Sequence, residues 1–247
     1  RLTPKQNEIA SRILEKTATA FVRDQGDILQ YVRWIAALEA RGVAVGWEAS
    51  YWHVWALIFS RNYDYGRQHH TRLCQRMERE AASNAPPPED LPQRMDHLRI
   101  CLSLFTDQLA DARLRADHWL AHEKTGDPFN VGSISCMKSI CLISNFKFAD
   151  AQRTMQIAEP ILRQVGSAYS SGWASLINAT LASYRGDYLG AYEILGPGLA
   201  QARKSLGDEA GICGTMALVA AQCLVEMGVD DQAMELVQMG LRTAHSH

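Results

Sequence analysis

Histidine pairs are the residues whose type and spacing come closest to a metal-binding pattern. His69 and His70 are adjacent, and His245 and His247 stand two positions apart at the end of the sequence. Adjacent side chains on a helix point about 100° apart, so His69 and His70 cannot both face one ion. The second pair is too little constrained to select zinc, and either pair supplies fewer ligands than a zinc site requires. We therefore expect no metal site.

Serine, cysteine and histidine side chains are present, but not in the arrangements used for nucleophilic or hydrolytic catalysis. The sequence has no G-x-S-x-G segment, no H-E-x-x-H segment and no G-x-x-x-x-G-K-[ST] phosphate loop. We expect this segment to carry no catalytic residue and no cofactor, and not to be an enzyme. A helical enzyme is the weakest of three functional hypotheses, and detection of turnover would be needed to support it.

Arginines on one helix face could contact phosphate or an acidic partner. Arg72, Arg76 and Arg79 share such a face, but Glu78 and Glu80 interrupt it. The whole sequence has 25 Lys and Arg against 27 Asp and Glu, a formal net charge of −2, and so produces no global positive field. We favour a solvated outer face on which arginine stems cover apolar surface, and expect no direct nucleic acid binding by this segment.

Cysteine usage and apolar runs indicate the cellular setting. The six cysteines form no C-x-x-C pair and no framework of the kind found in small secreted domains. No apolar run reaches the roughly 18 residues of a membrane helix, and the first residues lack an initiator Met and the apolar core of a signal peptide. We expect a cytoplasmic fragment of a longer chain, with reduced, buried thiols and no membrane contact.

The elements that position these residues are helices. Apolar residues recur at i, i+3, i+4 and i+7, and strand alternation is nowhere sustained. This pattern predicts an all-α protein of twelve helices that pair into six hairpins. The expected helices span 4–23, 27–41, 47–60, 64–83, 92–106, 108–125, 128–144, 147–165, 168–185, 188–206, 208–227 and 230–245.

Capping residues mark the clearest boundaries. Thr3 and Asp127 each precede a proline and are predicted N-caps, and Gly207 followed by Asp208 is a predicted helix stop and cap. The segment 84–92 is rich in proline and is expected to form an extended loop between hairpins.

Two prolines fall inside helical patterns. Pro160 and Pro197 each remove a backbone hydrogen bond and clash with the preceding turn, so we expect a kink or a break at both.

A short motif repeats at the bends of the hairpins. Its alanines are Ala112, Ala151, Ala191 and Ala233, spaced by 39, 40 and 42 residues, and a weaker copy surrounds Gly66. The motif predicts a small residue at the end of one helix, a polar cap on the next and an alanine that lets the two helices approach. A period near 40 predicts an α-solenoid of about six stacked hairpins, forming a single domain over residues 1–247.

The bend at 186–191, G-D-Y-L-G-A, resembles that of tetratricopeptide (TPR) repeats. The period exceeds the standard 34 residues, and longer TPR-like hairpins occur in the helical domain of the MalT-like, ATP-dependent LuxR-type activators of the STAND class. This chain resembles that domain over nearly its whole length. In the first half, W-I-A-A-L at 34–38 resembles the family's W-L-x-x-L segment, and V-W-A-L at 54–57 is a variant of its A-W-x-L segment.

The resemblance implies a right-handed TPR-like superhelix that senses an inducer or an inhibitory protein. It also implies an ATPase module before this segment and a DNA-binding helix-turn-helix after it, and neither occurs within this sequence. The alternative is a free-standing TPR-like adaptor that binds a peptide or protein partner. The sequence of the parent gene distinguishes these two hypotheses.

Stacked hairpins usually expose the first helix of each pair on a concave groove. Stepping back from the bend alanines selects positions whose aromatic, hydroxyl, amide and cationic groups suit a polar effector. The candidate groove residues are His53, Arg94, His97, Trp173, Thr180 and Gln222.

A single substitution tests the groove hypothesis. If Trp173 lies in the groove, Trp173→Ala weakens binding by on the order of 2 kcal/mol and hardly changes the melting temperature. If Trp173 instead packs in the core, the same change removes stability. Apolar surface near residues 230–247 is also expected to promote self-association.

Overall fold

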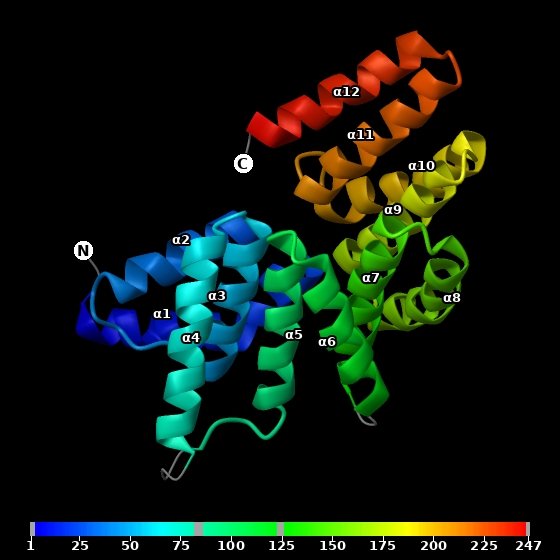
Figure 1. The fold of residues 1–247 in the computed structure, drawn as a ribbon. Helices are drawn as coiled ribbons and strands as arrows, with labels where there is room; N and C mark the ends of the chain where they lie inside the picture. Colours follow the sequence, from blue (N-terminus) through cyan, green and yellow to red (C-terminus); the bar gives the residue numbers. More distant parts are fainter. Residues whose placement is uncertain (1–2, 82–85, 123–125, 246–247) are drawn as a thin grey trace. The chain divides into compact units, whose positions relative to one another are not determined.

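Helices are the regular secondary structure of the residues that the structure, a computed structural model, describes: 3–81, 86–122 and 126–245 (Figure 1). Twelve α-helices and no strand occur within them, as the periodicity predicts. The helices are Pro4–Thr19 (α1), Ile28–Glu39 (α2), Trp47–Phe59 (α3), Tyr63–Glu80 (α4), Leu91–Phe105 (α5), Leu109–His122 (α6), Pro128–Ser144 (α7), Phe148–Val165 (α8), Ala168–Tyr184 (α9), Tyr188–Leu206 (α10), Gly211–Glu226 (α11) and Asp230–His245 (α12), and a short π-helix follows α1 at Ala20–Asp24.

Capping predictions hold where the cap is local. The Thr3 side chain accepts a hydrogen bond from the Gln6 amide, and the Gln6 side chain accepts one from the Thr3 amide, which completes a capping box. Asp127 accepts from the Phe129 amide. The prediction that Asp208 caps a helix is wrong: α11 begins only at Gly211, and Asp208 forms an ion pair with Arg203 at 2.7 Å.

The two internal prolines do not break their helices. α8 continues through Pro160 and α10 through Pro197. Each proline still lacks a backbone N–H, so the carbonyls of Gln156 and Glu193, four residues earlier, cannot receive the usual intrahelical hydrogen bond. A break is therefore wrong at both prolines, whereas a kink at either of them stays a prediction.

The chain divides into two compact units. Unit 1 comprises residues 1–23 and 27–115, and unit 2 comprises residues 24–26 and 116–247. The division runs through α6, not through the proline-rich segment, whose residues 84 and 85 lie outside the described residues, as does His247. The single domain over 1–247 stays a prediction.

In unit 1, α3 is the central helix. It packs against α1, α2, α4 and α5, and nine of its thirteen residues are buried. Its N-cap, Gly46, has no side chain to offer the first backbone amides. The Glu15 carboxylate of α1 accepts from the amides of Glu48 and Ala49 at 3.0 and 2.9 Å. A neighbouring helix thus supplies the cap.

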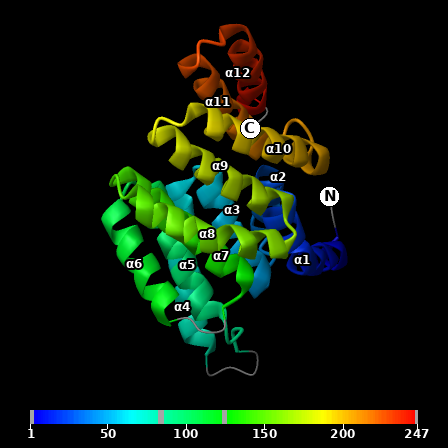
Figure 2. The same ribbon diagram turned by 90° about the vertical axis from the view of Figure 1, so that its right-hand side faces the viewer.

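In unit 2, each helix from α7 to α12 packs against the next along the chain. Figure 2 shows this succession from α8 upward to α12. α7 also contacts α9, and α9 contacts α11, so the first helices of successive hairpins adjoin. No helix within the described residues is both long and apolar enough to cross a lipid bilayer.

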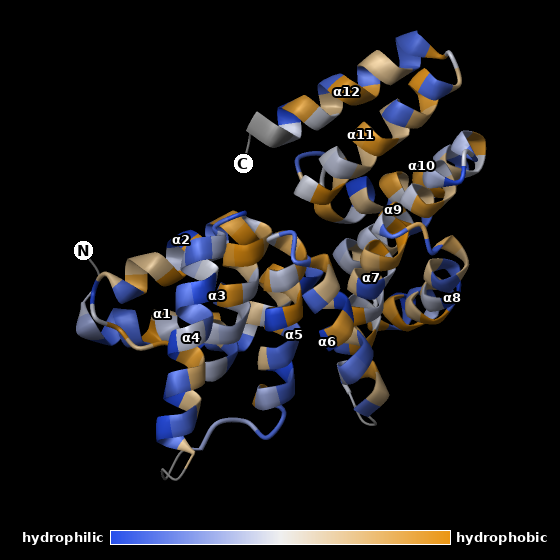
Figure 3. Cartoon of the chain, in the orientation of Figure 1, coloured by the Kyte–Doolittle hydropathy of each residue, from blue (hydrophilic) through white to orange (hydrophobic). Residues whose placement is uncertain are grey.

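The two helices of a hairpin differ in how much they bury. α7 buries eleven of its seventeen residues, whereas α8 buries four of eighteen, at Ala151, Met155, Ala158 and Leu162. These four lie on a single stripe. In Figure 3, hydrophilic and hydrophobic residues alternate along α12, the second helix of the last hairpin, as they do in a helix that buries one stripe. The first helices form the core and the second helices cover it.

Five helix-to-helix bends share one backbone geometry. A residue with positive φ, between 58° and 82°, follows each of α3, α5, α7, α9 and α11, and the amide after it donates to the carbonyl five residues earlier at 2.8 to 3.0 Å. This pattern is the Schellman motif. The five positive-φ residues are Arg61, Asp107, Phe146, Gly186 and Gly228.

A small buried residue follows each bend at the same distance. Five positions after the positive-φ residue stand Gly66, Ala112, Ala151, Ala191 and Ala233, all buried. The predicted role of the motif alanines, close approach of the paired helices, is consistent with this burial.

Because the bends share one backbone geometry, placing glycine at one bend and removing it from another should change the free energy of unfolding in opposite directions. Phe146 holds φ 58° without being glycine and is 75% exposed. Phe146→Gly should raise the free energy of unfolding by about 0.5 kcal/mol, since the left-handed conformation costs other residues roughly 1–2 kcal/mol. Gly186→Phe should lower it by about 1 kcal/mol. Urea unfolding measures both, and a loss of stability in Phe146→Gly would contradict the shared geometry.

Candidate functional site

The six predicted groove residues divide between the two units. Unit 1 holds His53 on α3, with Arg94 and His97 on α5, and unit 2 holds Trp173 and Thr180 on α9, with Gln222 on α11.

Arg94 belongs to a network of polar side chains inside unit 1. Its Nη1 lies 2.8 Å from Glu48 Oε2, its guanidinium lies 4.0 Å from the centre of the Tyr51 ring, and its side chain is 12% exposed. Glu48 Oε1 also accepts from Thr19 and from Trp52 Nε1, at 2.8 and 2.6 Å. Burial alone raises the pKa of Glu48, but the hydrogen bond and charge of Arg94 bring it below its usual value. These contacts give Arg94 a structural role.

His97 lies in the core, which corrects its assignment to an open groove. It is fully buried, its Nδ1 lies 3.4 Å from the Tyr51 hydroxyl oxygen, and its ring meets Trp55 edge to face. The physical reason is that α5 packs directly against α3, so the face chosen for a ligand is covered by protein.

The three residues in unit 2 lie in different environments. Trp173 is half-buried, with its ring 6.3 Å from that of Tyr169. The Thr180 hydroxyl donates to the Leu176 carbonyl at 2.8 Å, and Gln222 is exposed. Their contact with a ligand stays a prediction.

A hollow of about 720 Å³ lies within unit 2, between α8, α9 and α10. We call it the α8–α10 hollow. Its lining carries amides, carboxylates and guanidinium groups, together with Pro197 and Gly198 on the α10 side, where Gly198 packs closely against Ser175. Asn178 Nδ2 donates to Glu159 Oε2 at 2.9 Å, and Arg185 Nη1 donates to Gln152 Oε1 at 2.9 Å. The lining consists of Gln152, Gln156, Glu159, Arg163, Ser175, Asn178, Leu181, Ala182, Arg185, Asp187, Glu193, Ile194, Pro197 and Gly198, of which Leu181 and Ile194 are the large apolar members.

The hollow uses the opposite face of α9 from the predicted one. Ser175, Asn178, Ala182 and Arg185 follow one another at steps of three or four and share one face. Trp173 is nine residues from Ala182, about half a turn around the helix axis. The spacing of residues in the sequence identifies which side chains share a face of α9. It does not show which face borders the hollow.

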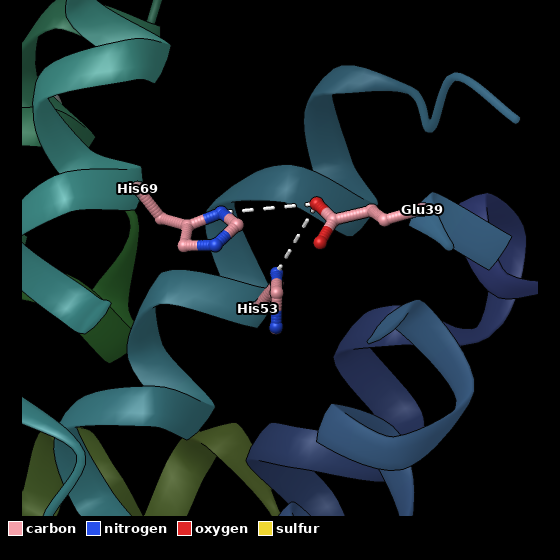
Figure 4. Close-up of side chains that lie close together, drawn as sticks. All are labelled: Glu39, His53 and His69. Carbon is pink, nitrogen blue, oxygen red and sulfur yellow. Dashed lines mark ion pairs between the residues drawn. The ribbon is translucent and has the colours of Figure 1, made fainter. Parts of the chain in front are cut away.

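A second polar cluster joins three helices of unit 1. Figure 4 shows Glu39 at the end of α2, His53 on α3 and His69 on α4 pointing toward one another. Glu39 Oε1 lies 3.9 Å from His53 Nδ1 and 3.7 Å from His69 Nδ1. The two imidazole rings meet edge to face at 4.8 Å. The sequence places His53 in a ligand groove, whereas the structure places it beside Glu39 and His69.

Burial keeps these histidines neutral. The side chain of His53 is 4% exposed and that of His69 is 18% exposed. Burial, together with the charge of His69, lowers the pKa of His53 to about 3. Burial also lowers the pKa of His69, and Arg72 adds to that effect while Glu39 opposes it. Both rings are therefore unprotonated near neutral pH.

Sequence reasoning considered His69 only beside His70. The structure separates them, since His70 Nε2 lies 3.1 Å from the Met95 carbonyl oxygen. A usable signal was present: His53 lies eight residues before the bend residue Arg61, and His69 lies eight after it. Residues equidistant from a hairpin bend adjoin across the two antiparallel helices.

The arginine face behaves as a covering surface. Arg76 lies 3.9 Å from the centre of the Trp47 ring, donates to the Val45 carbonyl at 2.9 Å and pairs with Glu80 at 3.1 Å. Its stem covers apolar surface, as expected.

The prediction that the cysteines are buried is confirmed for five of the six, and Cys74 is the exception. None of the six is in a disulfide, and all but the half-buried Cys74 are buried. Burial raises the pKa of Cys136 to about 12, which disfavours the reactive thiolate.

Comparison with known proteins shows the fold alone. No family model matches the sequence, and no curated protein matches it. The crystal structure of BtubC (BKLC) from P. vanneervenii is similar, with a TM-score of 0.57 and 12% sequence identity, over 98% of this chain and 91% of that chain. The two proteins share an all-helical fold.

Proposed function

We propose that the chain is a protein-interaction and effector-sensing module, which binds an extended polar segment of a partner in the α8–α10 hollow. The observation that carries this proposal is the polar lining of that hollow, on three helices of one unit. We also propose that its hairpins, about six of them, stack as a TPR-like right-handed α-solenoid. The recurring bends, which give successive hairpins the same backbone geometry, support this architecture.

The chemistry of the lining favours a peptide over an apolar small molecule. Amide side chains offer both donors and acceptors, Arg163 and Arg185 offer cationic donors, and Glu159 and Glu193 offer anionic acceptors. A peptide backbone requires both kinds of partner at regular intervals. Apolar ligands instead require pockets lined mainly by hydrophobic side chains.

The two prolines add backbone acceptors at the same place. Pro160 and Pro197 exclude the carbonyls of Gln156 and Glu193 from the intrahelical ladder, and both of those residues line the hollow. One lies on α8 and the other on α10, and we propose that each of these carbonyls accepts a hydrogen bond from a peptide N–H. This use accounts for two prolines inside otherwise regular helices.

The family resemblance gives the proposal a cellular context. We propose that this module is cytoplasmic and belongs to a MalT-like LuxR-type regulator, where an ATPase module and a helix-turn-helix are its partners in the parent chain. The alternative is a free-standing adaptor. A hollow whose lining suits a peptide is equally consistent with the adaptor and with the regulator. Sequencing the parent gene decides: a phosphate-loop module upstream and a helix-turn-helix downstream support the regulator, and their absence supports the adaptor.

A substitution that fills the hollow tests peptide binding. Panning a random peptide display library on the chain should enrich sequences that bind with micromolar affinity, and Ala182→Trp should reduce their affinity at least about tenfold by occupying the space. Trp173→Ala is the matched control on the opposite face of α9, and it should lower stability while leaving affinity per folded molecule unchanged. Equal binding by the Ala182→Trp variant would contradict the proposal.

A second variant separates binding from stability. Pro197→Ala restores an amide to α10 and should stabilise the chain, since proline inside a helix is unfavourable by about 3 kcal/mol relative to alanine in the absence of a compensating role. If the Glu193 carbonyl accepts from the peptide, the same change should weaken peptide affinity. A more stable variant with unaltered affinity would remove the proline argument.

A further inference from the structure

The cluster of Glu39, His53 and His69 has the composition of a transition-metal site. It offers two imidazole nitrogens and one carboxylate oxygen, and the three ligand atoms lie within 4.8 Å of one another. Each comes from a different helix of unit 1 (Figure 4). We propose that Glu39, His53 and His69 bind a divalent transition-metal ion, with zinc the best-matched member of that class.

The separations fit metal coordination better than direct hydrogen bonding. Glu39 Oε1 is 3.7 Å and 3.9 Å from the two imidazole nitrogens, beyond the limit of a hydrogen bond. Ligands about 2.0–2.1 Å from a tetrahedral zinc ion lie about 3.3–3.4 Å from one another. Rotation of the Glu39 side chain, which is 39% exposed, can shorten its own two separations to that spacing, and the two imidazole nitrogens, which lie within 4.8 Å of each other, must also move closer together when the ion binds.

Burial prepares the two histidines for this role. Their side chains are 4% and 18% exposed, so the packing of the surrounding helices restricts the positions that both rings can take. α3 packs against α2 and α4, which fixes the directions from which the ligands approach. Arg72 is the nearby positive charge that opposes binding, and the Glu39 carboxylate offsets it.

The expected consequence is a bound ion that joins α2, α3 and α4. Three protein ligands leave a fourth tetrahedral position for water or a further ligand. An ion held by three helices of one unit raises the stability of that unit, since the unfolded chain does not hold the ligands together.

Metal titration of the untagged, chelator-treated 247-residue chain tests the proposal. Isothermal titration with zinc chloride should give one ion per chain, and cobalt(II) should give the visible absorption of a tetrahedral ion without a thiolate charge-transfer band. Glu39→Gln and His69→Gln should each weaken zinc binding at least about tenfold, because each removes a ligand. Both positions are more exposed than His53, and circular dichroism should confirm that both variants fold.

Matched variants exclude the other histidines. His70→Gln combined with Cys74→Ser removes a neighbouring pair on α4, whose Nδ1 and Sγ lie 3.9 Å apart, and His118→Gln combined with His122→Gln removes a pair on α6. Both double variants should retain one zinc ion with unchanged affinity. The proposal is overturned if folded Glu39→Gln and His69→Gln bind zinc as tightly as the parent chain, if a double variant abolishes binding, or if no zinc binds at all.

Discussion

Arg94→Ala is expected to destabilise unit 1 by about 2–3 kcal/mol. Removing one partner of a buried ion pair typically costs about 3–5 kcal/mol, and Glu48 retains enough solvent contact to reduce that cost. The variant also loses the stacking of the guanidinium on Tyr51. Chemical denaturation followed by far-ultraviolet circular dichroism measures the change.

Three further variants test whether the loss of stability comes from the contacts of Arg94 with Glu48 and Tyr51. Arg99→Ala, an exposed arginine on the same helix, should change stability by less than about 0.5 kcal/mol. Arg94→Lys keeps the charge but not the planar group that stacks on Tyr51, so it should only partly restore stability. Glu48→Gln should recover part of the loss when added to Arg94→Ala, because no buried carboxylate is then left without its cation. Wild-type stability in Arg94→Ala would show that the network contributes nothing.

Acidification is expected to destabilise the chain while most carboxylates are still ionised. The pKa of His53 is lowered to about 3 in the folded state, whereas histidine in an unfolded chain titrates near 6.5. The unfolded state therefore binds the proton first. The contribution of His53 is complete above about pH 6.5 and is lost as the pH falls toward 3, with a limiting slope of about 1.4 kcal/mol per pH unit.

The histidine effect can be separated from that of the acids. The pKa of Glu48 is lowered from its usual value, so its own contribution disappears only at lower pH, and the interval from about pH 6.5 to 5 reports mainly on histidines. His69 and His70 also have lowered pKa values and add to the slope. His53→Gln should flatten it, measured with chelator present so that no metal competes with protons. A flat stability profile for the wild-type chain over this interval would refute the prediction.

Local sequence signals predicted the helices well because their causes are local. Thr3 and Asp127 cap helices through residues two or three positions away, and each bend depends on a few consecutive residues. Asp208 failed because Arg203, five residues before it, offers a competing ion pair. Pro197 failed to break α10 because packing around a helix of nineteen residues outweighs one lost hydrogen bond.

The sites were less predictable because they depend on which helix faces meet. One hairpin identifies the faces of α9 but not which neighbour covers each, so Trp173 was assigned to the face opposite the α8–α10 hollow. His97 was placed in a groove that α3 fills. Glu39, His53 and His69 come from three helices, and no short motif joins them.

The cap that Glu15 supplies to α3 has a consequence for the order of folding. Its acceptor oxygens lie in α1, and the amides that they receive belong to residues more than thirty positions later. The amides of Glu48 and Ala49 therefore gain this side-chain acceptor only when α1 has docked, which couples the ordering of the two helices. During synthesis, the Glu15 carboxylate lacks these two donors until the residues of α3 have also been made. A chain truncated beyond residue 15 lacks the carboxylate that caps the N-terminus of α3.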